Sequence, residues 1–232
     1  MSSIAIIPAR GGSKRIPRKN IRNFQGKPII GYSIEAAMNS NVFDEIMVST
    51  DDVEIADISK RFGAAIPFFR SPETSTDYTD TAEVLIEVLR EYKKLGKNYE
   101  TLCCIYPCAP FITGDILRES MEKLKSNGAD SIVPVVRFSY PPQRCVAIRK
   151  GKMEMLYPEN YNARSQDLEP LYHDAGQFYC ITSKAIFLEE KLFCKNSLPF
   201  VLNNYDAQDI DTEDDWIAAE IKYQILNQKR SL

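Results

Sequence analysis

The residues best suited to chemistry follow the first apolar run of the chain. Residues 4–8 read IAIIP and lead into ARGGSKRIPRKN, where five basic side chains fall within ten positions. Gly11 and Gly12 let the backbone turn sharply or approach a ligand closely, and Ser13 and Lys14 add hydrogen-bond donors. The pattern is typical of a loop that cradles a polyphosphate, although it matches neither the GxxxxGK[ST] P-loop nor the GxGxxG dinucleotide loop.

The alternative interpretation of this loop is a tight turn whose charges are solvated. Two features favour anion binding instead. The loop directly follows a predicted strand, and residues 1–34 contain no acid to neutralise their seven basic groups. These groups are Arg10, Lys14, Arg15, Arg18, Lys19, Arg22 and Lys27.

Carboxylates that could bind a metal occur near the other end, in DAQDIDTEDDW at 206–216. Thr212 is predicted to be a helix N-cap, and the helix dipole accounts for the acids at 213–215. Asp209 and Asp211 precede this cap, and residues two apart in an extended segment point the same way. Two converging carboxylates near a polyphosphate predict a Mg²⁺ site, with an exposed acidic loop as the alternative.

The basic loop and the acidic pair together predict a nucleoside triphosphate held by Arg and Lys, with Mg²⁺ across its phosphates. Phosphoryl and nucleotidyl transfer depend mainly on positioning and charge neutralisation, so no Ser/His/Asp constellation is required. The single histidine of the chain, His173, is therefore compatible with an enzyme.

The elements that must position these residues alternate along the chain. Strand-like runs at 4–8, 45–50, 101–107, 130–136 and 177–182 alternate with helical patterns at 28–39, 53–62, 80–95, 114–126 and 213–227. This alternation predicts a single α/β domain over 1–232, with a mostly parallel sheet and helices on both faces. Such sheets bind ligands at the carboxyl ends of their strands, where the basic loop lies.

One segment, about 137–173, departs from the alternation and is rich in Pro, Tyr and Arg. Within it, residues 144–156 (RCVAIRKGKMEML) predict a β-hairpin that turns at Lys150 and Gly151. We expect this segment to protrude from the core as an arm. Because an isolated hairpin is marginally stable in water, the arm is expected to pack against a second subunit and form a homodimer.

Composition excludes several classes of protein. The net charge of −3 argues against a general nucleic-acid or anionic-membrane binder. No charged and apolar leader precedes Ile4, and no apolar run approaches the roughly 20 residues that span a bilayer, so a cytoplasmic protein is expected. The six cysteines lack CxxC spacing and are expected to be buried, reduced thiols rather than zinc ligands or disulfides.

The motif ARGGSKRIPRKN resembles the N-terminal signature of the CMP-sugar synthetases, ARxGSKxxxxKN. Its fixed positions are matched by Ala9, Arg10, Gly12, Ser13, Lys14, Lys19 and Asn20. The resemblance covers essentially the whole chain and implies a Rossmann-like, three-layer fold of the nucleotide-diphospho-sugar transferase type. YPCAPF at 106–111, YPPQR at 140–144 and RSQDLEPLYHDAGQFY at 164–179 are most similar to the branch that acts on pseudaminic acid.

The resemblance also implies a set of site residues, with Lys14, Arg10 and Asp211 as the catalytic ones. On their own, Arg70 reads as a surface residue, and Thr81 as a helical residue beside Asp80, a plausible N-cap. The implied CTP site comprises Ala9, Arg10, Gly11, Gly12, Ser13, Lys14, Lys19, Asn20, Arg70, Asp77 and Thr81, and the metal site Asp209 and Asp211. The implied sugar site comprises Tyr106, Arg144, Arg164, His173, Asp174, Gln177 and Tyr179.

The expected reaction is attack of a sugar anomeric hydroxyl on the α-phosphorus of CTP, with release of pyrophosphate. Pseudaminic acid is the expected acceptor, with legionaminic and N-acetylneuraminic acids as alternatives. Sialic acid synthetases usually show QPTSP where residues 106–110 read YPCAP, and this difference argues against sialic acid itself. A non-catalytic nucleotide-binding regulatory module and a DxD glycosyltransferase are the alternatives from other classes. The family implies a bacterial pathway that decorates flagellin or surface polysaccharide.

Overall fold

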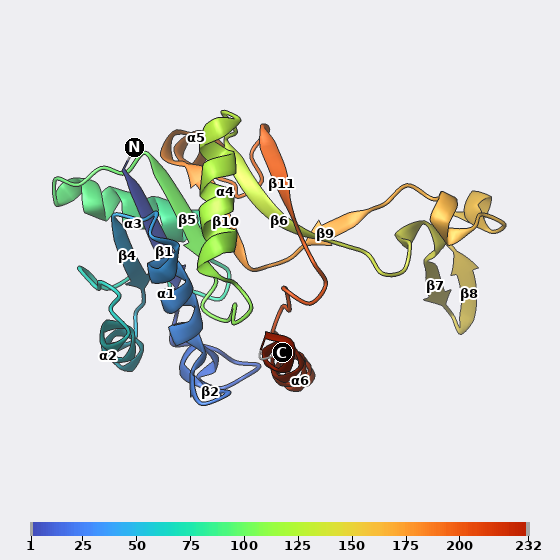
Figure 1. Ribbon diagram of the computed structural model, residues 1–232, viewed down its shortest axis with the longest axis horizontal. Coiled ribbons are helices and arrows are strands. Elements are labelled where there is room, and N and C mark those ends of the chain that lie inside the picture. Colours follow the sequence, from blue (N-terminus) through green and yellow to red (C-terminus); the bar gives the residue numbers. More distant parts are fainter. Residues whose placement is uncertain (1, 231–232) are drawn as a thin grey trace.

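The computed structural model describes residues 2–230 and is built around a central β-sheet (Figure 1). The strand order is β11-β6-β10-β5-β1-β4, with β9 paired to β6. These strands are β1 Ser3–Pro8, β4 Glu45–Ser49, β5 Thr101–Ile105, β6 Ser131–Arg137, β9 Tyr172–Asp174, β10 Phe178–Thr182 and β11 Ser197–Leu202. The short strands β2 (Asn23–Phe24) and β3 (Lys27–Pro28) form a separate ribbon.

The predicted α/β sheet is mostly parallel, as expected, and contains two antiparallel strands, β9 and β10. Strand β1 is parallel to β4 and β5, and β11 is parallel to β6, whereas β10 is antiparallel to both β5 and β6. Strands β9 and β11 were not predicted from the sequence. Pro199 interrupts the strand signal of β11, and a proline is tolerated there because β11 is the outermost strand.

The five predicted helices are confirmed to within a few residues at each end. They are α1 Ile29–Ser40, α2 Val53–Arg61, α3 Thr81–Lys94, α4 Gly114–Ser126 and α6 Glu213–Arg230. Asp80 caps α3 by accepting a hydrogen bond from the Ala82 amide, and Glu83 completes a capping box. A further helix, α5 (Ser183–Glu189), was not predicted; its seven residues are too short for a clear helical period.

The helices cover both faces of the sheet. Alternate residues of β1 point to opposite faces, so Ala5 and Ile7 pack with residues of α1, α2 and α4, whereas Ile4 and Ile6 pack with residues of α3 and α5. Both faces are buried, which explains why the strand reads as a continuous apolar run. The three-layer prediction is therefore confirmed.

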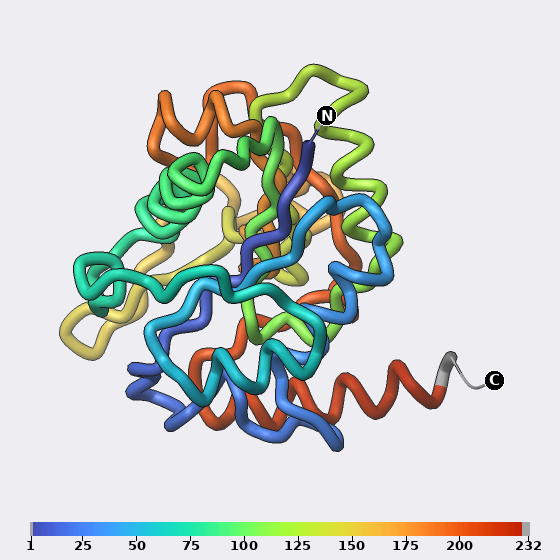
Figure 2. The backbone as a smooth tube through the Cα atoms, turned by 90° about the vertical axis from the view of Figure 1, so that its left-hand side faces the viewer, coloured from blue at the N-terminus to red at the C-terminus, as the bar shows by residue number. Residues whose placement is uncertain are grey.

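The C-terminal helix α6 lies along one end of the molecule beside the segment that follows β1 (Figures 1 and 2). Phe24 packs edge-to-face on Trp216 and on Tyr223, each with ring centroids 5.5 Å apart. The Thr212 hydroxyl accepts a hydrogen bond from the Asp215 amide at 3.2 Å, which confirms Thr212 as the N-cap. This packing brings residues 209–211 next to the basic loop.

The six cysteines are free, as expected, and five of them are buried; Cys145, in the arm, is half-buried. Cys103 and Cys180 face each other on β5 and β10 with their sulfurs 3.5 Å apart. Burial raises the pKa of the Cys103 thiol well above its usual range, which favours the protonated form. Within residues 2–230, no helix has both the length and the apolar character needed to cross a membrane.

The predicted arm protrudes far from the sheet (Figure 1). It carries a hairpin of β7 (Val146–Arg149) and β8 (Lys152–Met155). Its turn residues Lys150 and Gly151 have φ of 51° and 75°, as a type I′ turn requires. The hairpin prediction is confirmed, whereas dimerisation through the arm stays a prediction.

Candidate active site

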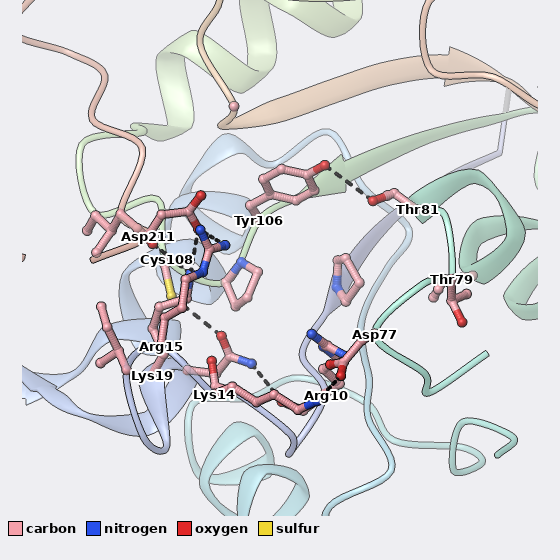
Figure 3. A pocket seen from close by; sticks show the side chains of 18 of the residues that line it. Arg10, Lys14, Arg15, Lys19, Asp77, Thr79, Thr81, Tyr106, Cys108 and Asp211 are labelled. Carbon is pink, nitrogen blue, oxygen red and sulfur yellow. Dashed lines mark hydrogen bonds and ion pairs between the residues drawn. The ribbon is translucent and has the colours of Figure 1, made fainter. Parts of the chain in front are cut away.

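A cavity of about 560 Å³ lies at the carboxyl ends of β1 and β5, and we call it the first cavity. The basic loop, the segment before α3, the turn after β5 and the acidic pair all reach it (Figure 3). The residues predicted from the sequence that line it are Arg10, Ser13, Lys14, Lys19, Asn20, Arg70, Asp77, Thr81, Tyr106, Asp209 and Asp211. Segments more than 190 residues apart therefore meet in one place.

The remaining loop residues shape its backbone. Ala9 is fully buried and its amide donates to the Ser49 carbonyl at 2.8 Å, and the Gly11 amide donates to Asp51 Oδ1 at 2.8 Å. A Cβ on Gly11 would lie 2.8 Å from Asp52 Oδ2, whereas a Cβ on Gly12 would meet nothing within 4 Å. A side chain at position 11 would therefore crowd Asp52, whereas Gly12 borders open space.

Asn20 holds the loop from inside. Its side chain is 6% exposed, and its amide nitrogen donates to the Arg10 carbonyl at 2.9 Å. Its carbonyl oxygen accepts from the Cys108 thiol at 3.5 Å, in the turn after β5. Asn20 therefore connects the loop to the neighbouring strand end, a positioning role that the sequence motif did not reveal.

The seven basic groups that lack a nearby acid in the sequence all have one in the folded chain. Arg10 and Lys14 both pair with Asp77, and Arg15 and Lys19 lie 2.8 and 3.5 Å from Asp211 Oδ1. The hydrogen bonds from Lys14 and Arg10 lower the pKa of Asp77. Arg18 pairs with Asp52 and Glu54, Arg22 pairs with Glu213, and Lys27 pairs with Glu35.

The basic loop is therefore neutralised in the folded chain, contrary to the expectation from the sequence. Its exposed ion pairs can nevertheless be exchanged for contacts with a bound phosphate. The Lys14 side chain is 80% exposed, and exposed ion pairs contribute little free energy. A phosphate that entered the cavity could therefore replace Asp77 as the partner of Lys14 at little cost.

Arg70 differs from the other cations because it is buried. Only 7% of it is exposed, and its Nε and Nη2 donate to the Ser49 hydroxyl and carbonyl at 3.0 and 2.6 Å. Among the described residues, no carboxylate lies within 4 Å of its guanidinium, and burial lowers the pKa of Arg70 to about 10. At neutral pH the first cavity thus contains a buried positive charge without an ion-pair partner.

Asp209 and Asp211 both line the first cavity, as the spacing predicted. The pKa of Asp209 is raised, mainly because the side chain is partly buried and secondly because the negative charge of Asp211 is close by. Lys19 Nζ donates to the Ile210 carbonyl at 2.6 Å, which fixes the backbone between the two carboxylates. Within residues 2–230 no group of three or more His, Cys, Asp or Glu residues is placed to hold a metal ion.

A second cavity, also of about 560 Å³, adjoins the first and shares Asp209 and Asp211 with it. His173 and Asp174 line it, as predicted for the sugar site. Ser139, Asn204 and Gln208 also line it and were missed, because isolated polar residues in loops carry no motif. In the first cavity, Arg15, Thr76 and Thr79 were missed, although Arg15 lies in the basic loop and both threonines lie in the STDYTDT segment.

The structure does not bring the other predicted sugar ligands to either cavity. Arg144 and Arg164 lie on the arm, where Arg164 Nε donates to Asp167 Oδ2 at 2.7 Å. Gln177 is fully buried, and its amide nitrogen donates to the Gln208 carbonyl at 3.1 Å. Tyr179 is also buried, since successive residues of β10 face the two sides of a covered sheet.

Tyr179 nevertheless acts on the second cavity through Asp174. The Tyr179 hydroxyl donates to Asp174 Oδ2 at 2.6 Å, and the Gly176 amide donates to Oδ1 at 3.0 Å. The Tyr179 ring packs on Tyr106, whose hydroxyl lies 3.2 Å from Thr81 Oγ1 in the first cavity. A short chain of contacts thus connects the two cavities and orients the Asp174 carboxylate.

Comparison with known proteins identifies the family of this chain. A family model described as cytidylyltransferase matches residues 4–216. The chain belongs to the cytidylyltransferase family. This cytidylyltransferase is 42% identical over 226 residues to the pseudaminic acid cytidylyltransferase of Campylobacter jejuni subsp. jejuni, with 97% of each chain covered.

A second relative and one solved structure also resemble this cytidylyltransferase. The CMP-N,N'-diacetyllegionaminic acid synthase of Legionella pneumophila is 35% identical over 236 residues, with 99% of each chain covered. The solved structure of CMP:2-keto-3-deoxy-manno-octonic acid synthetase complexed with CTP superposes with a TM-score of 0.72 at 17% identity, covering 98% of this chain and 100% of that one. At that identity the superposition shows the shared fold.

Proposed function

We propose that this cytidylyltransferase couples CTP to pseudaminic acid, giving CMP-pseudaminic acid and pyrophosphate. The identity of 42% across nearly the whole chain carries the proposal. The geometry supports it, because a cationic cavity, a pair of carboxylates and a polar second cavity adjoin one another. The relative of Legionella favours a legionaminic acid as the second candidate acceptor.

In this proposal the chain itself supplies most of the charge neutralisation. Arg10, Lys14 and Lys19 bind the triphosphate and the departing pyrophosphate, while Arg70 supplies a buried positive charge below them. Asp77, released from Lys14, accepts a hydrogen bond from the cytosine amino group or the ribose, beside Thr81. The anomeric hydroxyl of the sugar, held in the second cavity, attacks the α-phosphorus, and the bond to pyrophosphate breaks.

Asp209 and Asp211 would hold a Mg²⁺ ion. Their hard oxygen donors fit this ion, which usually binds one or two carboxylates and keeps phosphate and water as its other ligands. When bound there, the ion would supply Lewis-acid polarisation of the α-phosphate. Arg15 Nη2 lies 2.8 Å from Asp211 Oδ1, so this exposed side chain would have to turn away for Asp211 to hold the ion.

The test is pyrophosphate release with CTP and Mg²⁺ against pseudaminic, legionaminic, N-acetylneuraminic and 2-keto-3-deoxy-manno-octonic acids. ATP, GTP and UTP serve as nucleotide controls. We expect release with CTP and pseudaminic acid alone. Release with another acid would keep the reaction and correct the substrate, and no release despite CTP binding would favour a non-catalytic nucleotide-binding module.

Tyr179→Phe is expected to raise the KM for the sugar about fivefold and leave the KM for CTP unchanged. The substitution keeps the packed ring and removes the hydrogen bond that orients Asp174, so its effect on the sugar is indirect and modest. Steady-state kinetics with each substrate varied in turn measure the effect. Tyr92→Phe is the matched control, since it removes a buried hydroxyl that bonds Glu45 at a distance from both cavities; equal effects of the two variants would refute the positioning role.

We also propose that the chain forms a homodimer through the arm. Ile148 and Met153 are cross-strand partners in the hairpin and are 80% and 73% exposed, so a partner surface would remove them from water. A second copy would also give Arg144 and Arg164 a route to the carboxylate of a bound sugar. The Ile148→Glu, Met153→Glu double variant is expected to halve the mass measured by light scattering.

The matched control for the dimer is Leu188→Glu, which charges an equally exposed residue of α5 outside the arm. It should leave the mass unchanged. A wild-type chain that is already monomeric at micromolar concentration, or a double variant that stays dimeric, would contradict dimerisation through the arm.

A further inference from the structure

A third cavity, of about 400 Å³, lies between α3 and α5. It is distinct from the first cavity although α3 reaches both. Thr81 and Val84, in the first turn of α3, line the first cavity, whereas Leu89, Arg90 and Lys93 line the third, on average about 12 Å further along the helix axis at 1.5 Å per residue. The third cavity is lined by Leu89, Arg90, Lys93, Asn98, Tyr99, Ser183, Lys184 and Phe187.

The charge of this cavity is entirely positive. Arg90 and Lys93 come from α3 and Lys184 from α5, and no Asp or Glu is among the lining residues. Within residues 2–230, none of these three cations has an ion pair or a hydrogen bond, and the amide of Asn98 has no partner either. Three like charges around one hollow repel one another, and a bound polyanion would relieve this repulsion.

The rest of the lining is aromatic and apolar. The Tyr99 ring is fixed, because its hydroxyl donates to Glu45 Oε2 at 2.7 Å and its ring packs edge-to-face on Tyr92 at 5.3 Å. Phe187, from α5, is 44% exposed, and Leu89 is buried beneath the surface. Aromatic rings of this kind stack on planar heterocycles. An inorganic anion would make no use of this aromatic surface.

We propose that the third cavity is a second nucleotide-binding site. Arg90, Lys93 and Lys184 bind the phosphates. The guanidinium of Arg90 can bind a phosphate through two parallel hydrogen bonds. The base lies against Phe187 and Tyr99, where the Asn98 amide can donate to its edge and accept from it. The volume is within the range of small-molecule sites, and the proposal stands independently of the acceptor sugar.

The experiment is a titration of the full chain followed by ¹H–¹⁵N NMR, with ADP and inorganic pyrophosphate as separate probes. We expect the backbone amides of residues 89–99 and 183–187 to shift saturably with ADP. Pyrophosphate, which cannot stack, should need at least a tenfold higher concentration for half-saturation of the same amides.

Variants separate this site from general attraction of anions. Arg90→Ala combined with Lys184→Ala is expected to weaken ADP binding at these amides at least tenfold, and Phe187→Ser to weaken ADP but leave pyrophosphate unchanged. Lys94→Ala is the matched control, because Lys94 is a cation of the same helix that pairs with Glu91 outside the cavity; it should change nothing. Circular dichroism verifies that each variant is folded.

The proposal is overturned if ADP shifts none of these amides, or if the double variant binds as tightly as the wild type. Equal affinity for pyrophosphate and ADP, or an unaffected Phe187→Ser variant, would overturn the assignment to a nucleotide.

Discussion

Asp211→Asn is expected to lower kcat at least about 100-fold while the fold stays intact. The substitution keeps the shape of the side chain and removes one of the two negative charges that would hold the metal at the α-phosphate. A metal ion in this role contributes several kcal/mol to the transition state, and each 1.36 kcal/mol corresponds to a factor of ten in rate. Pyrophosphate release at saturating CTP and sugar measures the change.

The matched control is Asp214→Asn, three positions further along the chain. Asp214 lies in the first turn of α6, is exposed and lines neither cavity, so its loss should cost only a weak interaction with the helix dipole. A second measurement tests the metal directly, because the Asp211→Asn variant should need a higher Mg²⁺ concentration for half-maximal rate. Near-normal turnover of Asp211→Asn would exclude this carboxylate from the metal site.

The sequence predicted the architecture well where periodicity was strong. All five predicted helices and the arm hairpin are present because their patterns are local: an apolar stripe at helical spacing, or alternating residues around Lys150 and Gly151. The antiparallel direction of β10 could not be predicted, since a buried strand reads the same in either direction. The β11 strand was missed, and its Pro199, which weakens the strand signal, is tolerated because β11 lies at the edge of the sheet.

The candidate site was predictable in part for the same reason. The basic loop and the Asp209–Asp211 pair are short motifs with a local chemical logic. The acids that neutralise the loop come from distant segments, such as Asp77 and Asp211, and no inspection of residues 1–34 could supply them. Tyr179 was placed in the sugar site, but it lies in the core and acts through Asp174, a distinction that depends on which face of β10 is covered.

Arg70→Met is expected to lower kcat/KM for CTP by about 30-fold or more and to change the free energy of unfolding by no more than about 1 kcal/mol. Methionine fills a similar volume and removes the charge. The loss of one buried, charge-assisted contact with a phosphate costs about 1.5–3 kcal/mol or more in transition-state binding. Kinetics with CTP varied and urea denaturation measure the two quantities separately.

The combination of the two results decides what Arg70 is for. If it served only the fold, its removal would break two hydrogen bonds to Ser49 without effect on CTP, and stability would fall. A buried cation without an ion-pair partner is instead costly for the folded chain, so methionine should offset those lost bonds by removing the desolvation penalty. Arg61→Met, on the exposed surface of α2, controls for the loss of a positive charge alone. A stable fold with impaired CTP use would mean that the chain retains a destabilising charge because the triphosphate needs it.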